Sequence, residues 1–462
     1  MRSVHAVLLA AALAGLAGAV TYYVDAAAPP GGDGSIANPF DTIQGGIDAS
    51  SNGDEVVVLP GTYVENVSFS GSGITADFTL RSTDPEDPGV VAGTVIDGDG
   101  TGPVVAFIGV ETSTVLVTGL TITNGYYNLG AGVMGKNGSA SLSYCVITGN
   151  TSHSSLVSRG GGVHGLYGPI THCVITHNTV STDGAGAVTA GGGGLSYCDG
   201  SISNCLIDRN TASTTGVGAH AVGGGLYECN GTISNCTIAG NRALSTGGGT
   251  EQGGGLDHCA GTIINCIIYF NNPDQLAFSS LPTYSCIEGG GGGGTGNITA
   301  DPLFVTGPRG DYYLSHIAAG QASDSPCIDA GSGTAASHGL DTFTTRTDEV
   351  TDSLIVDMGY HYTSPRYVYT LSLGWNLIGY GGPGCSPVHL SGVVFSDGVE
   401  ARTWEHAAGA GWIQDPAFYY QTGVGYLQLG IPAPPRDSDQ IEPRLGYWLL
   451  VNQAGLTMLL SR

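Results

Sequence analysis

Apolar residues alternate with small or polar ones along most of the chain, and glycines interrupt the alternation. Within residues 160–271 one pattern occurs four times: three glycines and an aliphatic residue open each copy, and Cys-x-Ile-x-x-Asn closes it. A period of two indicates β-strands, and no stretch of about ten residues has helical periodicity without glycine. We therefore predict short strands joined by glycine corners. The copies open at Gly160, Gly192, Gly223 and Gly253 and close at Cys173, Cys205, Cys236 and Cys266.

The length of the copies indicates a solenoid. Counting a looser fifth copy that ends at Cys145 and Asn150, successive cysteines are 28, 32, 31 and 30 residues apart. Roughly 30 residues suit one coil of three short parallel strands, whose backbone hydrogen bonds run to the coils above and below. Equivalent residues then stack about 4.8 Å apart. We expect two aliphatic columns, Ile170, Ile202, Ile233, Ile263 and Ile175, Ile207, Ile238, Ile268, and one amide ladder, Asn178, Asn210, Asn241, Asn271.

The linked motifs Gly-Gly-x-aliphatic and aliphatic-x-x-Asn resemble the repeat of bacterial right-handed parallel β-helix proteins, including the polymorphic outer-membrane and adhesin type. Upstream, Pro60-Gly61-Thr62-Tyr63 and its surroundings resemble the opening of secreted proteins of this fold, in which a short helix, here 43–49, caps the first coil. Downstream, Asp301-Pro302-Leu303-Phe304 resembles the start of their closing segment. The resemblance implies an all-β, pectate-lyase-like right-handed parallel β-helix, a fold that carries pectin-active enzymes, adhesins and proteins of no known activity.

Composition divides the chain into three parts. Residues 1–19 combine Arg2, an apolar run and Ala17-Gly18-Ala19, and so resemble a secretory signal peptide. A membrane anchor is the alternative, but it needs about 20 apolar residues, and no later stretch is long enough to span a membrane. Residues 20–365 are predicted to form the β-helix, with an N-terminal cap over about 20–55 and a closing segment over about 272–365. Residues 366–462 hold all four tryptophans and predict a small C-terminal β-sandwich-like module. We expect the protein to be secreted or on the cell surface.

The net charge of the chain limits the classes of partner that it can bind. A net charge of −25 and a pI near 4.4 argue against nucleic acid, which needs a basic surface. They also count against a polygalacturonate ligand unless calcium bridges it. Asp97-Gly98-Asp99-Gly100 resembles part of a calcium loop, but it lacks the full pattern, and a tight corner is the favoured interpretation. No cofactor is therefore predicted, although calcium remains an open alternative.

Eight of the eleven cysteines fall into two columns of the predicted stack. Cysteines seven residues apart in one coil, such as Cys198 and Cys205, are candidates for a disulfide across a corner. Side chains stacked in register point the same way, which favours buried thiols that act as small apolar residues. The columns are Cys198, Cys229, Cys259 and Cys145, Cys173, Cys205, Cys236, Cys266.

Aligning the copies exposes a group of residues that does not repeat. The two positions before the first cysteine column hold aromatic and charged residues in three copies, and an aspartate follows Cys198. Rings that stack on sugars and carboxylates that bind hydroxyls are typical of glycan-binding grooves, whereas a solvated face with ordinary strand tyrosines is the alternative. In the C-terminal module two tryptophans flank a glycine-rich turn and suit either a sugar platform or a core. The candidates are Tyr197, Asp199, Tyr227, Glu228, Asp257, His258, Trp404 and Trp412.

Two functions follow from this pattern, and a purely structural surface protein is a third interpretation. The first is a non-catalytic, adhesin-like β-helix protein that binds a polysaccharide or a cell-surface glycan. The second is a polysaccharide lyase or glycoside hydrolase, which requires paired carboxylates, or carboxylates that hold calcium beside a basic residue. The hydrolase motifs Asn-Thr-Asp, Gly-His-Gly and Arg-Ile-Lys are absent from the sequence. Two or more carboxylates beside an Arg or Lys on one face would favour the enzyme.

Overall fold

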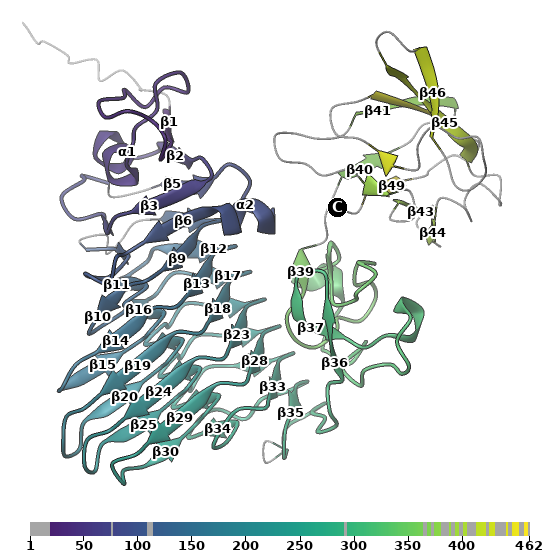
Figure 1. The fold of residues 1–462 in the computed structure, drawn as a ribbon. Coiled ribbons are helices and arrows are strands. Elements are labelled where there is room, and N and C mark those ends of the chain that lie inside the picture. The colour runs from purple at the N-terminus through teal and green to yellow at the C-terminus, as the bar shows by residue number, and fades with distance from the viewer. Residues whose placement is uncertain are drawn as a thin grey trace, which may run out of the picture. The chain divides into compact units, whose positions relative to one another are not determined.

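The computed structural model describes residues 19–363, apart from 75–76, 109–113 and 291–292, and the strands β40 to β49 of the region beyond. The chain forms two compact units, one of residues 1–338 with 353–361 and one of residues 339–352 with 362–462. Within the first unit, the parallel strands of successive coils stack on one another, from the end that carries α1 to the end that carries β34 and β35 (Figure 1).

Three parallel sheets line the core of the first unit. Sheet I contains β1 (Thr21–Val24), β2 (Glu55–Val58), β5 (Phe78–Ser82), β8 (Val115–Thr118), β12 (Ser141–Ser143), β17 (Ile170–Thr171), β22 (Ile202–Ser203), β27 (Ile233–Ser234) and β32 (Ile263–Ile264). Sheet II contains β3 (Gly61–Val64), β6 (Thr94–Asp97), β9 (Thr121–Thr123), β13 (Val146–Thr148), β18 (Val174–Thr176), β23 (Leu206–Asp208), β28 (Thr237–Ala239), β33 (Ile267–Tyr269) and β35 (Cys286–Ile287). Sheet III contains β4 (Val67–Ser68), β7 (Val105–Ala106), β11 (Val133–Gly138), β16 (Val163–Leu166), β21 (Leu195–Ser196), β26 (Leu226–Tyr227), β31 (Leu256–Asp257) and β34 (Leu276–Ala277).

The regular coils carry two further strands that the three-strand expectation missed. Between sheets II and III the chain forms a lateral extension, in which small side chains such as Val180, Ala190 and Ala212 form a second, thin core. Sheet IV contains β10 (Tyr126–Tyr127), β14 (Thr151–His153), β19 (Thr179–Thr182), β24 (Thr211–Thr214) and β29 (Arg242–Ser245). Sheet V contains β15 (Val157–Arg159), β20 (Thr189–Gly191), β25 (His220–Val222) and β30 (Glu251–Gln252).

The expected columns are confirmed by the strand register. In sheet I Ile170 pairs with Ile202, and in sheet II Ile175 pairs with Ile207, each continuing through the later coils. These isoleucines are at most 1% exposed, and burying each one contributes roughly 2 kcal/mol. Cysteines from both columns lie in the same core, and all ten cysteines that the structure describes are buried and free. The interpretation as buried thiols is therefore confirmed for these residues.

The amide ladder runs along the corner that follows sheet II. Each asparagine Oδ1 accepts hydrogen bonds from the backbone N–H and the Nδ2 of the asparagine one coil earlier, at 2.9–3.1 Å, from Asn150 through to Asn271. Gln275 replaces the next asparagine, because its Oε1 accepts from the N–H and Nδ2 of Asn271 at 3.2 and 2.7 Å. A side-chain amide thus closes the ladder at the last coil.

Helix α1 (Ile43–Ala49) covers the N-terminal end of the stack, as expected from the sequence. The Oγ1 of Thr42 accepts from the N–H of Gly45, and the carboxylate of Glu65 accepts from the N–H groups of Ile43 and Gln44. These bonds satisfy donors that a helix N-terminus leaves unpaired. Ile43 and Ile47 are buried against the first core residues. A second short helix, α2 (Pro88–Gly93), precedes β6.

The later segment of the first unit, residues 301–338 with 353–361, packs along the outer side of the stack. Its hairpin, β36 (Phe304–Gly307) with β37 (Gly310–Leu314), precedes the short helices η1 (Ile317–Ala319) and η2 (Ala335–His338). Ile267, Tyr269 and Leu314 belong to a core cluster shared by sheet II and this segment. The backbone N–H and carbonyl of His361 exchange hydrogen bonds of 2.8 and 2.9 Å with the amide of Asn204, which fixes the end of the segment to the corner after sheet I.

The second unit is all-β. A short antiparallel pair, β38 (Phe343–Thr344) with β39 (Tyr362–Thr363), is followed by two four-stranded antiparallel sheets and the pair β42 (Val388–His389) with β47 (Gln440–Ile441). One sheet contains β40 (Tyr367–Thr370), β49 (Thr457–Leu460), β43 (Val393–Ser396) and β44 (Ala401–Thr403), and the other contains β41 (Gly374–Gly379), β48 (Gly446–Val451), β45 (Ile413–Gln421) and β46 (Gly425–Leu429). Among the described residues, no helix has the length and hydropathy needed to cross a membrane.

Candidate functional site

All the candidate residues of the β-helix except Asp199 come from the ends of the sheet III strands. His164, Ser196, Tyr227 and Asp257 pair in register across four successive strands. The next residue leaves the sheet in the left-handed region, with φ of 53° at Tyr197, 51° at Glu228, 53° at His258 and 47° at Phe278. This turn brings side chains from two adjacent positions to one outer face.

The rings on this face form a continuous series, which we call the aromatic row: His164, Tyr197, Tyr227, His258 and Phe278. Successive ring centroids are 5.7, 5.8, 6.1 and 4.9 Å apart. The first three contacts are edge-to-face, a favourable geometry for aromatic pairs. Tyr197 and Tyr227 are half-buried, whereas His258 and Phe278 are exposed. The row crosses four coil steps and presents ring edges and faces to solvent.

Arg159 from β15 supplies a positive charge to the row. Its guanidinium carbon lies 5.0 Å from the centroid of the Tyr227 ring, and its Nη1 donates to the carbonyls of Ser158 and Thr189. Burial lowers the pKa of His164 to about 4, and the charge of Arg159 adds to that effect. His164 is therefore neutral at pH 7, and its Nδ1 lies 2.8 Å from the Oγ of Ser196.

Glu228 interacts with both tyrosines of the row. Burial is the largest cause that raises the pKa of Tyr197, and the charge of Glu228 adds to it. For Tyr227, burial again raises the pKa most, followed by a hydrogen bond with Glu228. Both phenols therefore remain protonated at neutral pH and can donate a hydrogen bond.

Asp257 and His258 form a side-chain hydrogen bond at the next coil. The Oδ1 of Asp257 contacts the Nδ1 of His258, whose side chain is 51% exposed, whereas the Asp257 side chain is fully buried. Burial raises the pKa of Asp257, and hydrogen bonding to His258 opposes the rise. The Oδ2 of Asp257 has no hydrogen-bond partner among the described residues. The carboxylate of Asp257 is therefore buried, and its contact with His258 orients the exposed ring.

Asp199 occupies a different place, at the corner between sheets III and I. Its Oδ1 accepts from the N–H of Asn230 at 3.0 Å, and the Oδ1 of Asn230 accepts from the N–H of Ala260 at the same distance. The side chain of Asp199 thus links successive coils. It also lines a pocket of about 700 Å³ together with Thr232, Thr262 and Leu281.

Trp404 and Trp412 lie outside the described residues, as do residues 1–18 of the expected signal peptide. The calcium-like fragment forms a turn, in which the Oδ1 of Asp97 accepts from the N–H of Asp99 at 2.9 Å and from the Nδ2 of Asn124 at 2.7 Å. The Oδ1 of Asp97 is thus hydrogen-bonded within the turn, which agrees with the interpretation as a tight corner.

A second charged cluster joins sheet II to the segment beyond residue 301. Arg209 contacts Asp208 at 3.2 Å and Asp311 at 2.9 Å, and its guanidinium carbon lies 5.7 Å from the centroid of the Tyr312 ring. Burial raises the pKa of Asp208, and the charge of Arg209 partly opposes that rise. This cluster holds the hairpin on the stack.

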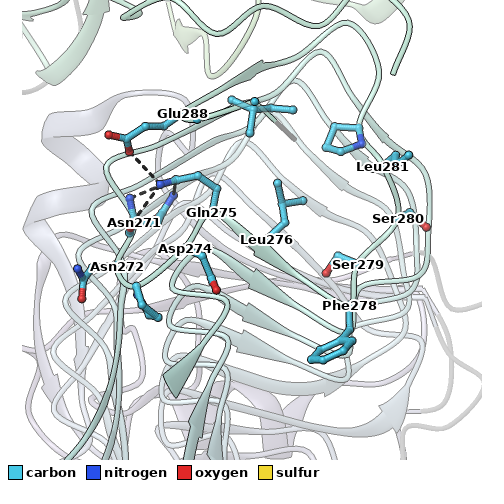
Figure 2. Close-up of a pocket in the computed structure, with 15 residues that line it drawn as sticks. Asn271, Asn272, Asp274, Gln275, Leu276, Phe278, Ser279, Ser280, Leu281 and Glu288 are labelled. Atoms are coloured by element: carbon cyan, nitrogen blue, oxygen red, sulfur yellow. Dashed lines mark hydrogen bonds between the residues drawn. The ribbon is translucent and has the colours of Figure 1, made fainter. Parts of the chain in front are cut away.

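The last coils enclose a pocket of about 690 Å³ between residues 271 and 290 (Figure 2). Phe278, Ser279, Ser280 and Leu281 lie on one side of it, Asn271, Asn272 and Glu288 lie on the other, and Leu276 lies between them (Figure 2). Sequence reasoning did not find this pocket. The signal was present, because Leu276-Ala277-Phe278 aligns with Leu256-Asp257-His258.

Comparison with known proteins gives few relatives. No family model matches the chain, and no curated protein shows significant similarity to it. The pectate lyase Pel9A is similar at 13% identity with a TM-score of 0.32, and the alignment covers 69% of this chain and 93% of the lyase. A deglycosylated pectin methylesterase from Aspergillus niger is similar at 16% identity with a TM-score of 0.26, covering 59% of this chain and 77% of the esterase. The class of the protein follows instead from its own strand pairing: it is a right-handed parallel β-helix protein with a further all-β unit.

Proposed function

We propose that this protein is a non-catalytic, secreted or cell-surface β-helix protein that binds carbohydrate along the aromatic row. The observation that carries the proposal is the continuity of the row: five rings, in contact from coil to coil, line one face. The coils repeat about every 4.8 Å, which is close to the length of one glycosyl unit in an extended glycan. Successive sugars therefore meet successive rings.

Polar groups around the rings suit sugar hydroxyls. The phenols of Tyr197 and Tyr227 stay protonated and donate, the carboxylate of Glu228 accepts, and the exposed ring of His258 is held in one orientation by Asp257. A few placed polar groups among apolar and aromatic side chains are typical of small-ligand sites. The row offers such groups on a rigid sheet.

A polysaccharide lyase or glycoside hydrolase is the second candidate, and one observation favours it. Glu228 and Asp257 lie on the same face as Arg159, and the charge of Glu228 contributes to the raised pKa of Asp257. Against this candidate, Arg159 donates to two backbone carbonyls, and a guanidinium does not lose its proton in proteins. Asp257 is also fully buried beneath His258.

A glycan array, followed by incubation with acidic and neutral polysaccharides with and without calcium, tests the proposal. We expect binding without release of reducing or unsaturated ends. Release of such ends that is abolished by Glu228→Gln would establish the enzyme instead.

Site variants locate the binding. Tyr197→Asn combined with Tyr227→Ala should lower affinity at least roughly tenfold, since Asn tolerates the positive φ of Tyr197 while both rings are lost. The control is Tyr126→Ala with Tyr127→Ala, two exposed tyrosines of sheet IV that are 46% and 41% exposed. Equal affinity in both double variants would remove the row as the binding site.

A further inference from the structure

The pocket at the end of the stack is continuous with the aromatic row. Strand β34 pairs with β31 so that Leu276 lies beside Leu256 and Ala277 beside Asp257. Phe278 consequently takes the next place after His258, with the two ring centroids 4.9 Å apart. Phe278 also lines the pocket and is 69% exposed. A ligand that follows the row therefore reaches the pocket where the coils stop.

The walls of the pocket are held in place by hydrogen bonds. The Oε2 of Glu288 accepts from the Nε2 of Gln275 and from the N–H of Phe270, both at 2.8 Å, and Gln275 also binds Asn271 (Figure 2). The Oδ1 of Asp274 accepts from the N–H of Gly253. These contacts fix the polar wall before any ligand binds, and fixed polar groups bind with less loss of conformational freedom.

The chemistry of the pocket suits one end of a sugar chain. Phe278 and Leu281, which are 69% and 60% exposed, present apolar surface on one side. Asn272, Asp274 and Glu288 present amide and carboxylate oxygens on the other side, and carboxylate oxygens accept more than one hydrogen bond. The volume, about 690 Å³, lies within the range of small-ligand sites.

The acidic residues along the row and in the pocket favour neutral glycans over anionic ones. Asp274 and Glu288 line the pocket, and Glu228 lies along the row. The chain as a whole carries a net charge of −25. The guanidinium of Arg159 lies over Tyr227, which is two ring contacts from either end of the row, and it donates to backbone carbonyls. A polyuronate would meet repulsion from Glu228 at the row and from Asp274 and Glu288 in the pocket, whereas a neutral chain would not.

We propose that this pocket binds the terminal sugar of a neutral glycan whose preceding units lie along the aromatic row. This inference rests on the proposed function, because it assigns the row and the pocket to one ligand. It adds a chain-end site at Phe278, Leu281, Asp274 and Asn272, and it names an uncharged polysaccharide as the ligand class.

The test compares chains of different length at equal mass. The probes are size-fractionated linear neutral glucans and chitooligosaccharides, with oligogalacturonate of matched length as the anionic probe. Recognition of chain ends predicts that tenfold shorter chains bind roughly tenfold more protein per gram, because they offer tenfold more ends. Binding per gram that is independent of chain length would overturn the chain-end site and leave binding along the row intact.

A matched pair of variants tests the pocket itself. Phe278→Asn should weaken binding of the neutral oligosaccharides roughly tenfold, whereas Phe270→Asn should leave it unchanged. Phe270 has the same left-handed backbone, with φ of 59°, and is 50% exposed at the same end of the stack, but it lies outside the pocket. If Phe278→Asn does not fold, Leu281→Ser tests the same pocket and should also weaken binding.

The outcomes separate this inference from the proposed function. Equal affinity for Phe278→Asn, Leu281→Ser and Phe270→Asn would refute the pocket while the row stands. Tighter binding of oligogalacturonate than of the neutral probes would refute the ligand class. Failure of the wild-type protein to bind any glycan would refute the proposed function together with the inference.

Discussion

Replacing one asparagine inside the amide ladder is a sensitive test of what holds the coils together. The side chain of Asn210 makes four buried hydrogen bonds: its Nδ2 donates to Ile175 O at 2.8 Å and Asn241 Oδ1 at 3.0 Å, and its Oδ1 accepts from the N–H and Nδ2 of Asn178 at 3.0 and 3.1 Å. Asn210→Ala removes all four. The buried N–H of Asn178 then loses its acceptor.

The size of the effect follows from these contacts. At about 1 kcal/mol of net stability for each bond, with more for a buried donor left without a partner, the loss is about 4 kcal/mol in the free energy of unfolding. Urea unfolding followed by circular dichroism measures it. With an m-value of about 3 kcal/mol per M, the midpoint should fall by roughly 1 M.

Asn230→Ala is the matched control. Asn230 also links successive coils, through its Oδ1 and the N–H of Ala260 at 3.0 Å, but it is exposed at the corner between sheets III and I. Water replaces the lost contact there, so the cost should stay below about 1 kcal/mol. A midpoint for Asn210→Ala no lower than that for Asn230→Ala would refute the reasoning, since the ladder would then contribute no more than a surface contact.

Three further predictions concern titration, thiols and the outer segment. Burial lowers the pKa of His172 to about 4, so unfolding takes up a proton, and stability falls by up to roughly 3 kcal/mol for this residue as pH drops from about 6.5 to 4. His172→Asn, which fits the φ of 55° at this position, should make the melting temperature depend less on pH over that range. An unchanged pH dependence would contradict the assignment. The ten buried cysteines should react with a thiol reagent only after denaturation. In the native protein at most one thiol should react, that of Cys385, which lies outside the described residues. Several reactive thiols in the native protein would mean that the reagent reaches the cysteine columns of the core. Asp311→Ala should lower the free energy of unfolding by less than about 1 kcal/mol, because the ion pair of Asp311 with Arg209 is exposed. Arg209→Ala should lower it by about 2 kcal/mol or more, because Asp208 is then buried without its cation. Equal losses of stability in the two variants would show that Asp208 does not depend on Arg209.

The fold was predictable wherever identical residues repeat. Stacking places equivalent positions on top of one another, so the spacing of Cys205, Ile207 and Asn210 in each copy was enough to predict the buried columns and the amide ladder. Helix α1 was predictable from the resemblance of its surroundings to the opening of secreted β-helix proteins. Sheets IV and V were not, because Thr, Ser and Ala in segments such as Thr179–Thr182 give no strong apolar alternation. Their strands depend on pairing with neighbouring coils.

The site was only partly predictable. Alignment of the copies found Tyr197, Tyr227 and His258, which the structure brings into one row. It could not show that rings from two adjacent positions interleave, because that depends on the left-handed turn at Tyr197 and His258. The burial of Asp257 and the approach of Arg159 to Tyr227 from β15, two coils earlier, also arise from packing between segments rather than from local sequence.

A crystal structure of the full chain grown with the oligosaccharide that binds best on the array tests the central claim most directly. The account predicts sugar rings over Tyr197 and Tyr227, continuing past His258 to Phe278. A ligand held by the all-β unit or by another sheet of the solenoid, with the aromatic row unoccupied, would contradict it.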